Sequence, residues 1–299
     1  MSAGLTRFVG VDGVQIAVTT IGEGPGLLLL HGFPESKRMW RRLLPILSSR
    51  FSVVAADLRG YGDSSTPPSG TDHRPYSKRT MAREMVQVMS RLGHETFSVA
   101  GHDRGGRVAY RMALDFPDTV RRLAVLDVLP VDVVWAEADE RMGLAFWPWT
   151  LLAQAEPLPE AMLTAAAPTV IEHALSQQWG TPAATFDVDD RRAYTDMLRD
   201  RAHAHAICEE YRAAATVDRD DDTADRSEGR RISCPVLALW SESGPLNDWY
   251  THLGGPLELW RALAGDVVGG PVAGGHFFPE QHPTETAQAL TAFFAPAEI

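Results

Sequence analysis

Short apolar runs alternate with amphipathic segments over the first 130 residues of the chain. The runs of strand length, each followed within two residues by Gly or Asp, are 14–20, 27–30, 51–56, 97–100 and 122–126. Between them, residues 77–92 carry apolar side chains at helical spacing, and residues 105–115 are predicted to form another helix. Short, wholly apolar strands between amphipathic helices indicate a mostly parallel sheet with helices on both faces.

The pattern changes at about residue 130. Residues 131–231 have a helical pattern that is rich in Ala, Trp and acidic residues, with no convincing strand. Strand patterns return at 235–240 and, more weakly, at 267–272, before a closing helix at 284–294. We therefore predict an α/β core formed by residues 1–130 and 232–299, interrupted by a helical cap, or lid, formed by residues 131–231. The dense charge run at 219–231 is predicted to be a solvated connector that leaves this lid.

The net charge narrows the range of partners. The chain has 299 residues, with 28 basic and 39 acidic side chains, so its formal charge is −11. This balance disfavours nucleic acid and anionic membrane surfaces as partners. An anionic substrate would need its own local arginines.

Cysteine usage and the terminal pattern predict a cytoplasmic protein. The two cysteines, Cys208 and Cys234, are too few for a disulfide scaffold and are expected to be reduced thiols. Residues 1–10 lack a basic segment followed by an apolar stretch, so no signal peptide is expected there. The longest apolar runs are far shorter than a membrane span.

A candidate nucleophile lies in the run Gly-His-Asp-Arg-Gly at 101–105, between a predicted strand and a predicted helix. Glycines two residues before and after Asp103 relieve the crowding of a sharp strand-to-helix elbow, which exposes one side chain above the sheet. A carboxylate at this position attacks an sp³ carbon and forms an ester, whereas it is poorly suited to acyl transfer. The alternative is that Asp103 is only a helix N-cap.

A triad in the order nucleophile, acid, histidine completes this hypothesis. His276 lies between the last predicted strand and the last helix, where it can activate water to cleave the ester. For the acid that orients it we favour Asp127, directly after a strand, over Glu242 and Asp248. Asp57, also at a strand end, is interpreted as a carboxylate that organises its loop.

Two arginines next to the nucleophile indicate an anionic substrate. Arg104 and Arg107 are three residues apart, so on a helix they share one face and can both reach a small carboxylate near Asp103. Arg111, one turn further on, is expected to form a surface ion pair. The backbone N–H groups of Phe33 and Arg104 are predicted to form an oxyanion hole for ester hydrolysis. The expected substrate is a short carboxylate with a leaving group on the adjacent carbon, and neither a metal nor a cofactor is expected.

At this point the chain resembles a known family. The motifs that carry the resemblance are His-Gly-Phe-Pro at 31–34, Asp-Leu-Arg-Gly-Tyr-Gly at 57–62, Gly-His-Asp-Arg-Gly-Gly-Arg at 101–107, Cys-Glu-Glu-Tyr-Arg-Ala at 208–213 and Gly-Gly-His-Phe at 274–277. They resemble those of the fluoroacetate (haloacetate) dehalogenases, which have the α/β-hydrolase fold. The resemblance implies that Asp103 is the nucleophile, His276 the base and Asp127 its acid. It also implies that Arg104 and Arg107 bind the substrate carboxylate and that the protein is a homodimer.

One position departs from the family pattern. The family binds the leaving halide with a His-Trp pair and a lid tyrosine, and here Trp149 and Tyr211 match two of these three residues. Pro148 stands where the histidine is expected, and proline offers no side-chain donor. Fluoride is small and strongly hydrated and needs close donors, so we predict a dehalogenase of 2-halo carboxylates that is weaker on fluoroacetate than on chloroacetate. The sequence does not reveal whether the Trp147 indole faces the same pocket.

Two other functions fit parts of the pattern. An epoxide hydrolase shares the Asp nucleophile and the histidine base, but it needs two lid phenols to protonate the epoxide oxygen. Tyr211 offers one phenol, and Tyr194 is the candidate for the other. A hydrolase-fold protein that binds without catalysis is the remaining alternative, although it need not keep all three triad residues.

Overall fold

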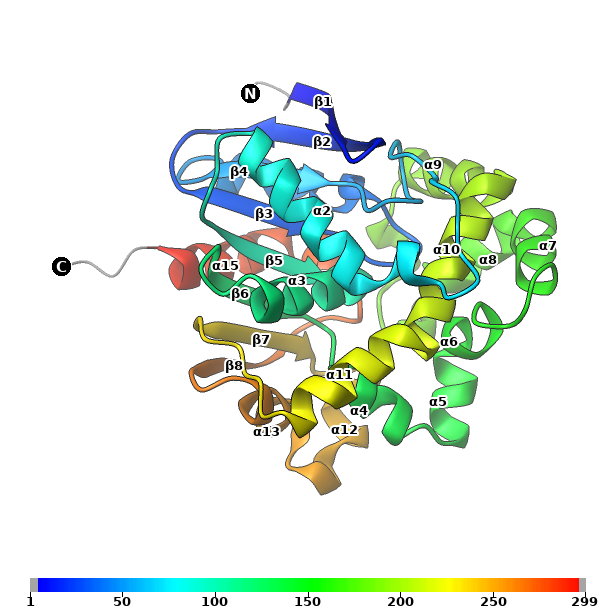
Figure 1. The fold of residues 1–299 in the computed structure, drawn as a ribbon. Helices are drawn as coiled ribbons and strands as arrows, with labels where there is room; N and C mark the ends of the chain where they lie inside the picture. The colour runs from blue at the N-terminus through cyan, green and yellow to red at the C-terminus, as the bar shows by residue number, and fades with distance from the viewer. Residues whose placement is uncertain (1–4, 296–299) are drawn as a thin grey trace.

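The computed structural model describes residues 5–295, which form a single eight-stranded sheet in the order β1-β2-β4-β3-β5-β6-β7-β8 (Figure 1). The strands are β1 (Leu5–Val11), β2 (Val14–Ile21), β3 (Gly26–Leu30), β4 (Ser52–Ala56), β5 (Phe97–His102), β6 (Val120–Leu126), β7 (Val236–Ser241) and β8 (Val267–Val272). Strand β2 pairs antiparallel with β1 and β4, and all other neighbours are parallel. The mostly parallel sheet predicted from the sequence is confirmed.

Helices cover both faces of this sheet. Outside the segment between β6 and β7, they are η1 (Lys37–Arg42), α1 (Leu44–Leu47), η2 (Arg74–Tyr76), α2 (Lys78–Arg91), α3 (Asp103–Asp115), α12 (Pro245–Trp249), η5 (Thr251–Leu253), α13 (Gly255–Leu263), α14 (Phe278–Gln281) and α15 (Pro283–Phe294). Alternate side chains of β3 enter opposite layers, because successive residues of a strand point to opposite faces. Leu28 and Leu30 pack with side chains of α2 and α3, whereas Leu27 and Leu29 pack with side chains of η1, α1 and α15.

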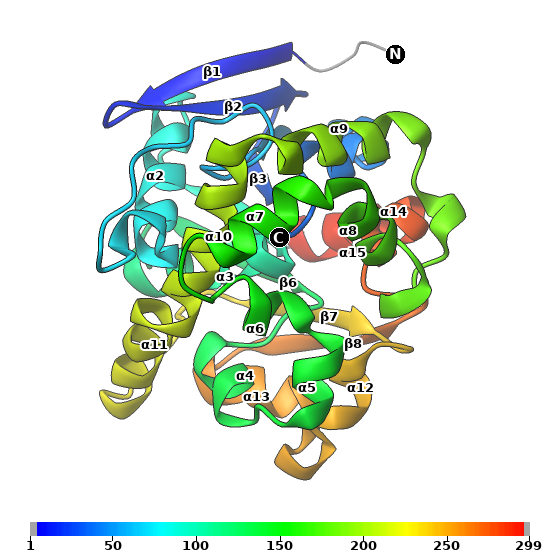
Figure 2. The ribbon, with the colours of Figure 1, turned by 90° about the vertical axis from the view of Figure 1, so that its right-hand side faces the viewer.

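The segment between β6 and β7 is helical throughout. It contains α4 (Val131–Ala136), α5 (Glu140–Ala145), α6 (Trp147–Leu151), α7 (Leu158–Ala165), α8 (Ala167–Ala174), η3 (Gln177–Trp179), η4 (Ala183–Thr185), α9 (Val188–Arg199), α10 (Arg201–Ala215) and α11 (Val217–Ser227). Figures 1 and 2 show α5 to α10 gathered over the end of the sheet toward which the parallel strands point. We refer to residues 131–231 as the insert.

Strand β1 was not predicted, because it lies at the sheet edge and carries no apolar run. Leu5 and Phe8 are 58% and 60% exposed, so the strand alternates neither in hydrophobicity nor in burial. No signal peptide is expected in residues 1–10. Of these, residues 1–4 lie outside the described residues, and residues 5–10 belong to β1. Within residues 5–295, no helix is long and apolar enough to cross a membrane.

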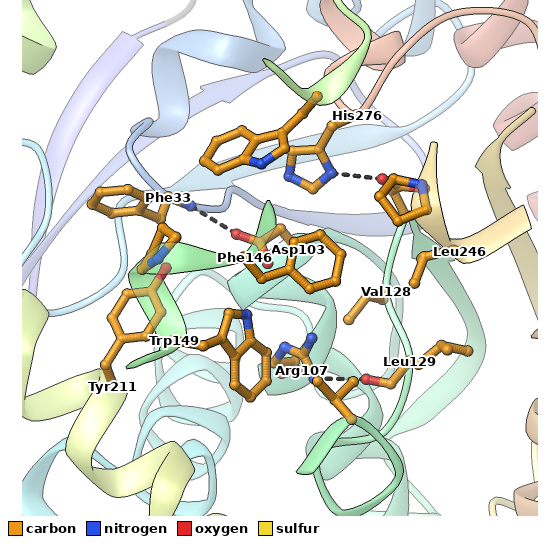
Figure 3. Close-up of a pocket in the computed structure, with 15 residues that line it drawn as sticks. Phe33, Asp103, Arg107, Val128, Leu129, Phe146, Trp149, Tyr211, Leu246 and His276 are labelled. Atoms are coloured by element: carbon orange, nitrogen blue, oxygen red, sulfur yellow. Dashed lines mark hydrogen bonds and ion pairs between the residues drawn. The ribbon is translucent and has the colours of Figure 1, made fainter. Parts of the chain in front are cut away.

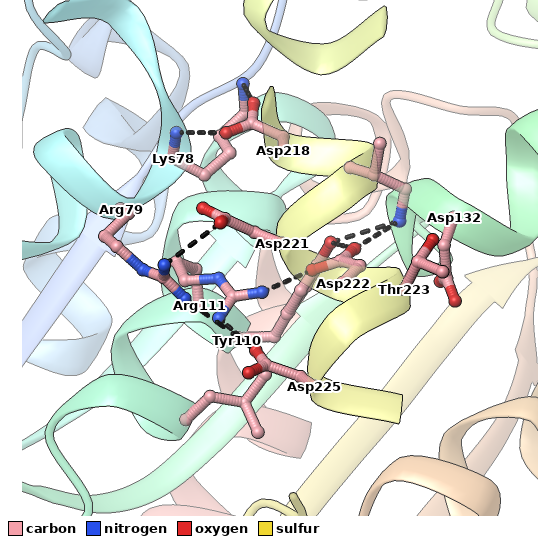
Figure 4. Close-up of polar contacts among 12 residues, drawn as sticks. Lys78, Arg79, Tyr110, Arg111, Asp132, Asp218, Asp221, Asp222, Thr223 and Asp225 are labelled. Atoms are coloured by element: carbon pink, nitrogen blue, oxygen red, sulfur yellow. Dashed lines mark hydrogen bonds and ion pairs between the residues drawn. The ribbon is translucent and has the colours of Figure 1, made fainter. Parts of the chain in front are cut away.

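The charge run is the clearest departure from the sequence prediction. Instead of a solvated connector, most of it is helix α11, which packs against the core with buried acids on one face (Figure 4). Asp218, Asp222 and Asp225 are three or four residues apart, so they point the same way on the helix. The prediction of a solvated connector was wrong, because a count of charges does not reveal that the buried acids share one face of a helix.

These acids pair with cations of the core. Arg111 is 2% exposed and donates to Asp222 (Nη2–Oδ1, 2.5 Å) and to Asp225, so its ion pairs are buried rather than at the surface as expected. Lys78 Nζ contacts Asp218 (3.3 Å), and the Tyr110 hydroxyl donates to Asp222. Helix α11 is thus held against the core by charge neutralisation.

Candidate active site

Asp103 lies at the sharp turn between β5 and α3. Its φ of 43° is in the left-handed region, which is strained for a residue with a β-carbon. A Cβ at Gly101 would lie 2.3 Å from the Gly105 carbonyl oxygen, and a Cβ at Gly32 would lie 2.6 Å from Asp103 Cβ. Only glycines leave room for so tight an elbow, which lifts the Asp103 side chain above the sheet.

A backbone N–H group binds the Asp103 carboxylate, and another lies next to it in sequence. The Phe33 N–H donates to Asp103 Oδ2 (3.0 Å; Figure 3). The Arg104 N–H lies in the first turn of α3, where N–H groups have no intrahelical acceptor. Burial alone would raise the pKa of Asp103. The charges of His276, Arg104 and Arg107 outweigh it and lower that pKa, so the group is a carboxylate at neutral pH.

His276 is oriented by Asp127. Its Nδ1–H donates to Asp127 Oδ2 at 2.6 Å, which leaves Nε2 as the free ring nitrogen. Asp127 follows β6, and its Oδ1 accepts the backbone N–H of Ser241 (2.8 Å), so the carboxylate is fixed between two strands. Burial alone would lower the pKa of His276. The hydrogen bond to Asp127 and the charges of Asp127 and Asp103 together raise it.

The other carboxylates considered from the sequence lie elsewhere. Glu242 and Asp248 are exposed, and neither contacts His276 in the described structure. Asp57 accepts from the Lys37 Nζ (2.6 Å) and from the Asp63 N–H (2.9 Å), so it organises its loop as predicted. Of these candidates, the structure brings only Asp127 to the histidine.

Asp103, Arg107, Asp127 and His276 line one cavity, whose remaining walls are mainly apolar and aromatic. Figure 3 shows His276 on one side of Asp103, with Trp149 and Arg107 on the other. The cavity offers about 50 Å³ to the centres of water-sized groups. Since one water needs on the order of 10–15 Å³ on this measure, the cavity fits a ligand of a few heavy atoms.

Arg107 is the cation of this cavity. It is buried, its Nη1 donates to the Leu129 carbonyl oxygen (2.6 Å), and its guanidinium lies 4.4 Å from the Trp149 ring centroid. Burial lowers the pKa of Arg107, and the charge of Arg104 lowers it further, although a guanidinium still stays protonated at neutral pH. No carboxylate of the described residues forms an ion pair with it, so it can bind an anion placed beside Asp103.

Arg104 does not face this cavity, in contrast to the expectation that both arginines bind the substrate. Its fully buried guanidinium forms a bidentate pair with Glu210 of α10 (Nε–Oε2, 2.8 Å; Nη2–Oε1, 2.6 Å). It also lies 4.0 Å from the Tyr211 ring centroid. Glu210 additionally accepts from Lys78, so one acid of the insert pairs with two core cations, and Lys78 has Asp218 as a second counter-ion. The charge available to a ligand is therefore that of Arg107.

The expected leaving-group residues lie together. Trp149 and Tyr211 line the cavity, and Pro148 lines it beside them at the position that departs from the family pattern. Trp147 does not line it, because its ring packs edge-on against Phe33 and its indole N–H is buried. This answers the question that the sequence left open about Trp147.

Two further groups beside the triad were not predicted. His102 Nε2–H donates to the His276 carbonyl oxygen (2.9 Å), and burial lowers the pKa of His102 to about 4, so the ring is neutral. Glu35 is fully buried, 3.5 Å from His102 Nδ1, and burial raises its pKa to about 8. The sequence feature that could have indicated Glu35 is its position directly after the His-Gly-Phe-Pro motif. Trp179 and Leu246 also line the cavity, and no local pattern marks them.

The described residues offer no evident metal centre. Among them, no three His, Cys, Asp or Glu side chains are grouped as metal ligands. The acids and the histidine of the cavity already have hydrogen-bond partners, since His276 binds Asp127 and Asp103 accepts from the Phe33 N–H.

Comparisons with known proteins agree with this geometry. A family model for the alpha/beta hydrolase fold matches residues 25–283. A fluoroacetate dehalogenase from Burkholderia sp is 40% identical over 291 residues, covering 97% of this chain and 94% of the relative. A soluble epoxide hydrolase from Corynebacterium sp. (strain C12) is 31% identical, covering 96% of each chain.

Solved structures are similar over almost the whole chain. A Nostoc sp PCC 7120 protein provisionally described as an α/β hydrolase is 42% identical, with a TM-score of 0.93 and 98% coverage of each chain. A mutant of a Pseudomonas aeruginosa protein provisionally described as an epoxide hydrolase, with bound MFA, is 38% identical, with a TM-score of 0.89 and coverage of 97% of this chain and 95% of that one.

Proposed function

The chain belongs to the fluoroacetate dehalogenase family of the α/β-hydrolase fold, and we propose that it hydrolyses the carbon–halogen bond of short 2-halo carboxylates. The observation that carries the proposal is the meeting, in one small cavity, of an elbow aspartate, the His276–Asp127 pair and the Arg107 cation. A serine-hydrolase mechanism needs a hydroxyl where Asp103 lies. A neutral substrate would leave Arg107 without a partner.

In the first half of the proposed reaction, an Asp103 oxygen attacks the carbon that bears the halogen. The new carbon–oxygen bond forms as the carbon–halogen bond breaks, and the halide leaves with the bonding electron pair. The Trp149 N–H and the Tyr211 O–H are the proposed donors to the departing halide, and Arg107 holds the substrate carboxylate. The product of this step is an ester of Asp103.

In the second half, water attacks the Asp103 ester carbon while His276 Nε2 takes a proton from it. The oxyanion that forms accepts hydrogen bonds from the Phe33 and Arg104 N–H groups. Collapse breaks the bond to the substrate oxygen, which takes the proton back from His276 and leaves as a 2-hydroxy acid. Asp103 is released as a carboxylic acid and loses its proton to solvent, which restores the carboxylate, so the net change is one water consumed and one hydrogen halide released.

The family resemblance and the net charge suggest the domain organisation, the oligomeric state, the location and the partner of the protein. We propose that residues 131–231 act as a lid on an α/β core, that the protein is a cytoplasmic homodimer, and that its partner is a small anionic substrate rather than nucleic acid or membrane. The −11 net charge disfavours nucleic acid and anionic membranes, and attraction of a small anionic substrate then depends on a local cation, Arg107. No cofactor enters the mechanism.

Epoxide hydrolysis is the second candidate, since relatives of that description cover nearly the whole chain. Such a reaction needs two phenols facing the epoxide oxygen. Tyr211 lines the cavity, whereas the buried Tyr194 lies outside it, which favours the dehalogenase. Turnover of styrene oxide compared with chloroacetate separates the two activities, and a covalent ester in either case excludes a protein that only binds.

We expect faster halide release from chloroacetate than from fluoroacetate, because Pro148 supplies no donor to fluoride. The Pro148→His variant adds one, and a hydrogen bond to a charged group is worth about 1.5–3 kcal/mol. The fluoroacetate-to-chloroacetate ratio of kcat/KM should then rise by roughly 10- to 100-fold. Pro148→Ala is the matched control, since it removes the ring without adding a donor. A wild-type preference for fluoroacetate would contradict the argument.

Ester hydrolysis should accelerate as the pH rises and His276 loses its proton, because only the neutral ring accepts a proton from water. In the ester Asp103 has lost its charge, so Asp127 is the group that still raises the pKa of His276. Asp127 contributes to that elevation, so removing its charge lowers the pKa. In Asp127→Asn we therefore expect the midpoint of the acid limb to move to lower pH, with a slower plateau. Single-turnover rates of ester decay over a pH series measure both. An unchanged or higher midpoint would refute the role of Asp127.

A further inference from the structure

A short piece of the insert lies directly on the loop that carries His276. This strap consists of Trp179, the last residue of η3, and of Gly180 and Thr181, which lie between η3 and η4. The His276 N–H donates to the Trp179 carbonyl oxygen (2.8 Å), and the Phe277 N–H donates to the Thr181 hydroxyl oxygen (3.0 Å). Two successive peptides of the histidine loop are therefore bonded to the insert rather than to the core.

The two segments touch through their backbones. A Cβ at Gly275 would lie 2.2 Å from both the Gly180 carbonyl carbon and the Thr181 nitrogen, so a glycine is required there. Gly180 itself has a φ of 79°, which favours glycine. Thr181 is fully buried, so water does not replace its hydroxyl as an acceptor. The strap and the loop are therefore in direct backbone contact.

The opposite side of His276 is held by the core. Its carbonyl oxygen accepts from His102, the residue before the nucleophile, and its Nδ1–H donates to Asp127. The Trp179 ring packs edge-on against the imidazole, with ring centroids 5.7 Å apart. The main chain of His276 is thus fixed between the nucleophile elbow and the strap, and the strap also contacts its ring.

We propose that Thr181 is a positioning residue for ester hydrolysis, through which the insert holds His276 in place to activate water. The inference rests on the proposed function, in which His276 acts only in the second half of the reaction. A displaced histidine loop should therefore slow ester hydrolysis and spare the attack of Asp103. Displacement of a catalytic group by about 1 Å costs on the order of 100-fold in rate.

The test is Thr181→Val, which keeps the shape of the side chain and removes the acceptor, assayed with chloroacetate by rapid quench. We expect first-turnover halide release within about twofold of wild type and ester hydrolysis slower by about 10- to 100-fold. The Asp103 ester should accumulate in the intact mass spectrum during turnover. Thr181→Ser, which keeps the hydroxyl, should restore hydrolysis. Thr164→Val is the control, since that hydroxyl donates only to carbonyls of its own helix, α7.

Equal losses in both half-reactions would show that Thr181 only stabilises the fold, and unchanged hydrolysis would show that the strap is dispensable. Either result overturns the proposal. If chloroacetate gives no ester in the wild type, styrene oxide is used in the same assay, because the strap acts on any ester of Asp103. Failure to form an ester with either substrate overturns the proposed function and, with it, the role of Thr181.

Discussion

Replacing Asp103 with asparagine should abolish halide release, with a loss of at least about 10⁴-fold in kcat. The amide keeps the size of the side chain and the hydrogen bond to the Phe33 N–H through its oxygen, but it has no anionic oxygen to attack carbon. Because no ester forms, we also expect no added mass on the protein after incubation with chloroacetate. Halide electrode traces and intact mass spectra measure the two effects.

This experiment needs a check on the variant itself. The introduced amide would lie beside His276 and the oxyanion donors, which are arranged to hydrolyse a carbonyl at that position, so slow deamidation would regenerate aspartate. The mass of the variant must therefore be confirmed before and after each assay. Asp248→Asn, an exposed carboxylate in α12, is the control and should keep full activity. Wild-type rates in a verified Asp103→Asn protein would show that the elbow assignment is wrong.

Replacing His276 with asparagine should separate the two halves of the reaction. Asp103 still attacks the substrate, because the Arg107 cation and the Phe33 N–H remain, but no base is left to activate water. We expect one halide per active site followed by arrest, with steady turnover reduced by about 10²- to 10⁴-fold. The protein mass should increase by one carboxymethyl group, and peptide mapping should locate that group on Asp103.

The control is His252→Asn, an exposed histidine paired with Glu137, which should turn over normally. Continued turnover of His276→Asn at the wild-type rate would mean that another group activates water. A burst followed by arrest without added mass would contradict an Asp103 ester, because decay of that ester would regenerate Asp103 and sustain turnover. A trapped ester would also exclude a protein that only binds ligands.

Local patterns were sufficient to predict most of the sheet and to select Asp103, Asp127 and His276, which the structure brings together in one cavity. The elbow at Asp103 and the strand end at Asp127 are marked within a few residues of themselves by glycines and apolar runs, because sharp turns and buried strands impose local requirements. Strand β1 lacks such a requirement, because it is an exposed edge. The sequence therefore predicts the buried elements better than the exposed ones.

Partners distant in sequence were not predictable in this way. Arg104 pairs with Glu210, which is 106 positions later on another element, so the motif around the nucleophile gives no sign that this guanidinium is already neutralised. The acids of α11 pair with Arg111 in the same manner. Charge pairing between elements depends on how the insert docks, and a single sequence does not encode that in any local signal.

The ion pairs between the insert and the core limit which parts of the molecule can be recombined. Arg104, Lys78 and Arg111 belong to the core, and their buried counter-ions all come from α10 and α11. A chimaera whose lid lacks these acids would leave Arg104 and Lys78 unpaired, at about 3–5 kcal/mol apiece, whereas Arg111 would keep only Asp115 of α3. Because whole domains are stable by about 5–15 kcal/mol, the two losses would remove most of the stability of an average domain. Helices α10 and α11 must therefore be inherited together with the core.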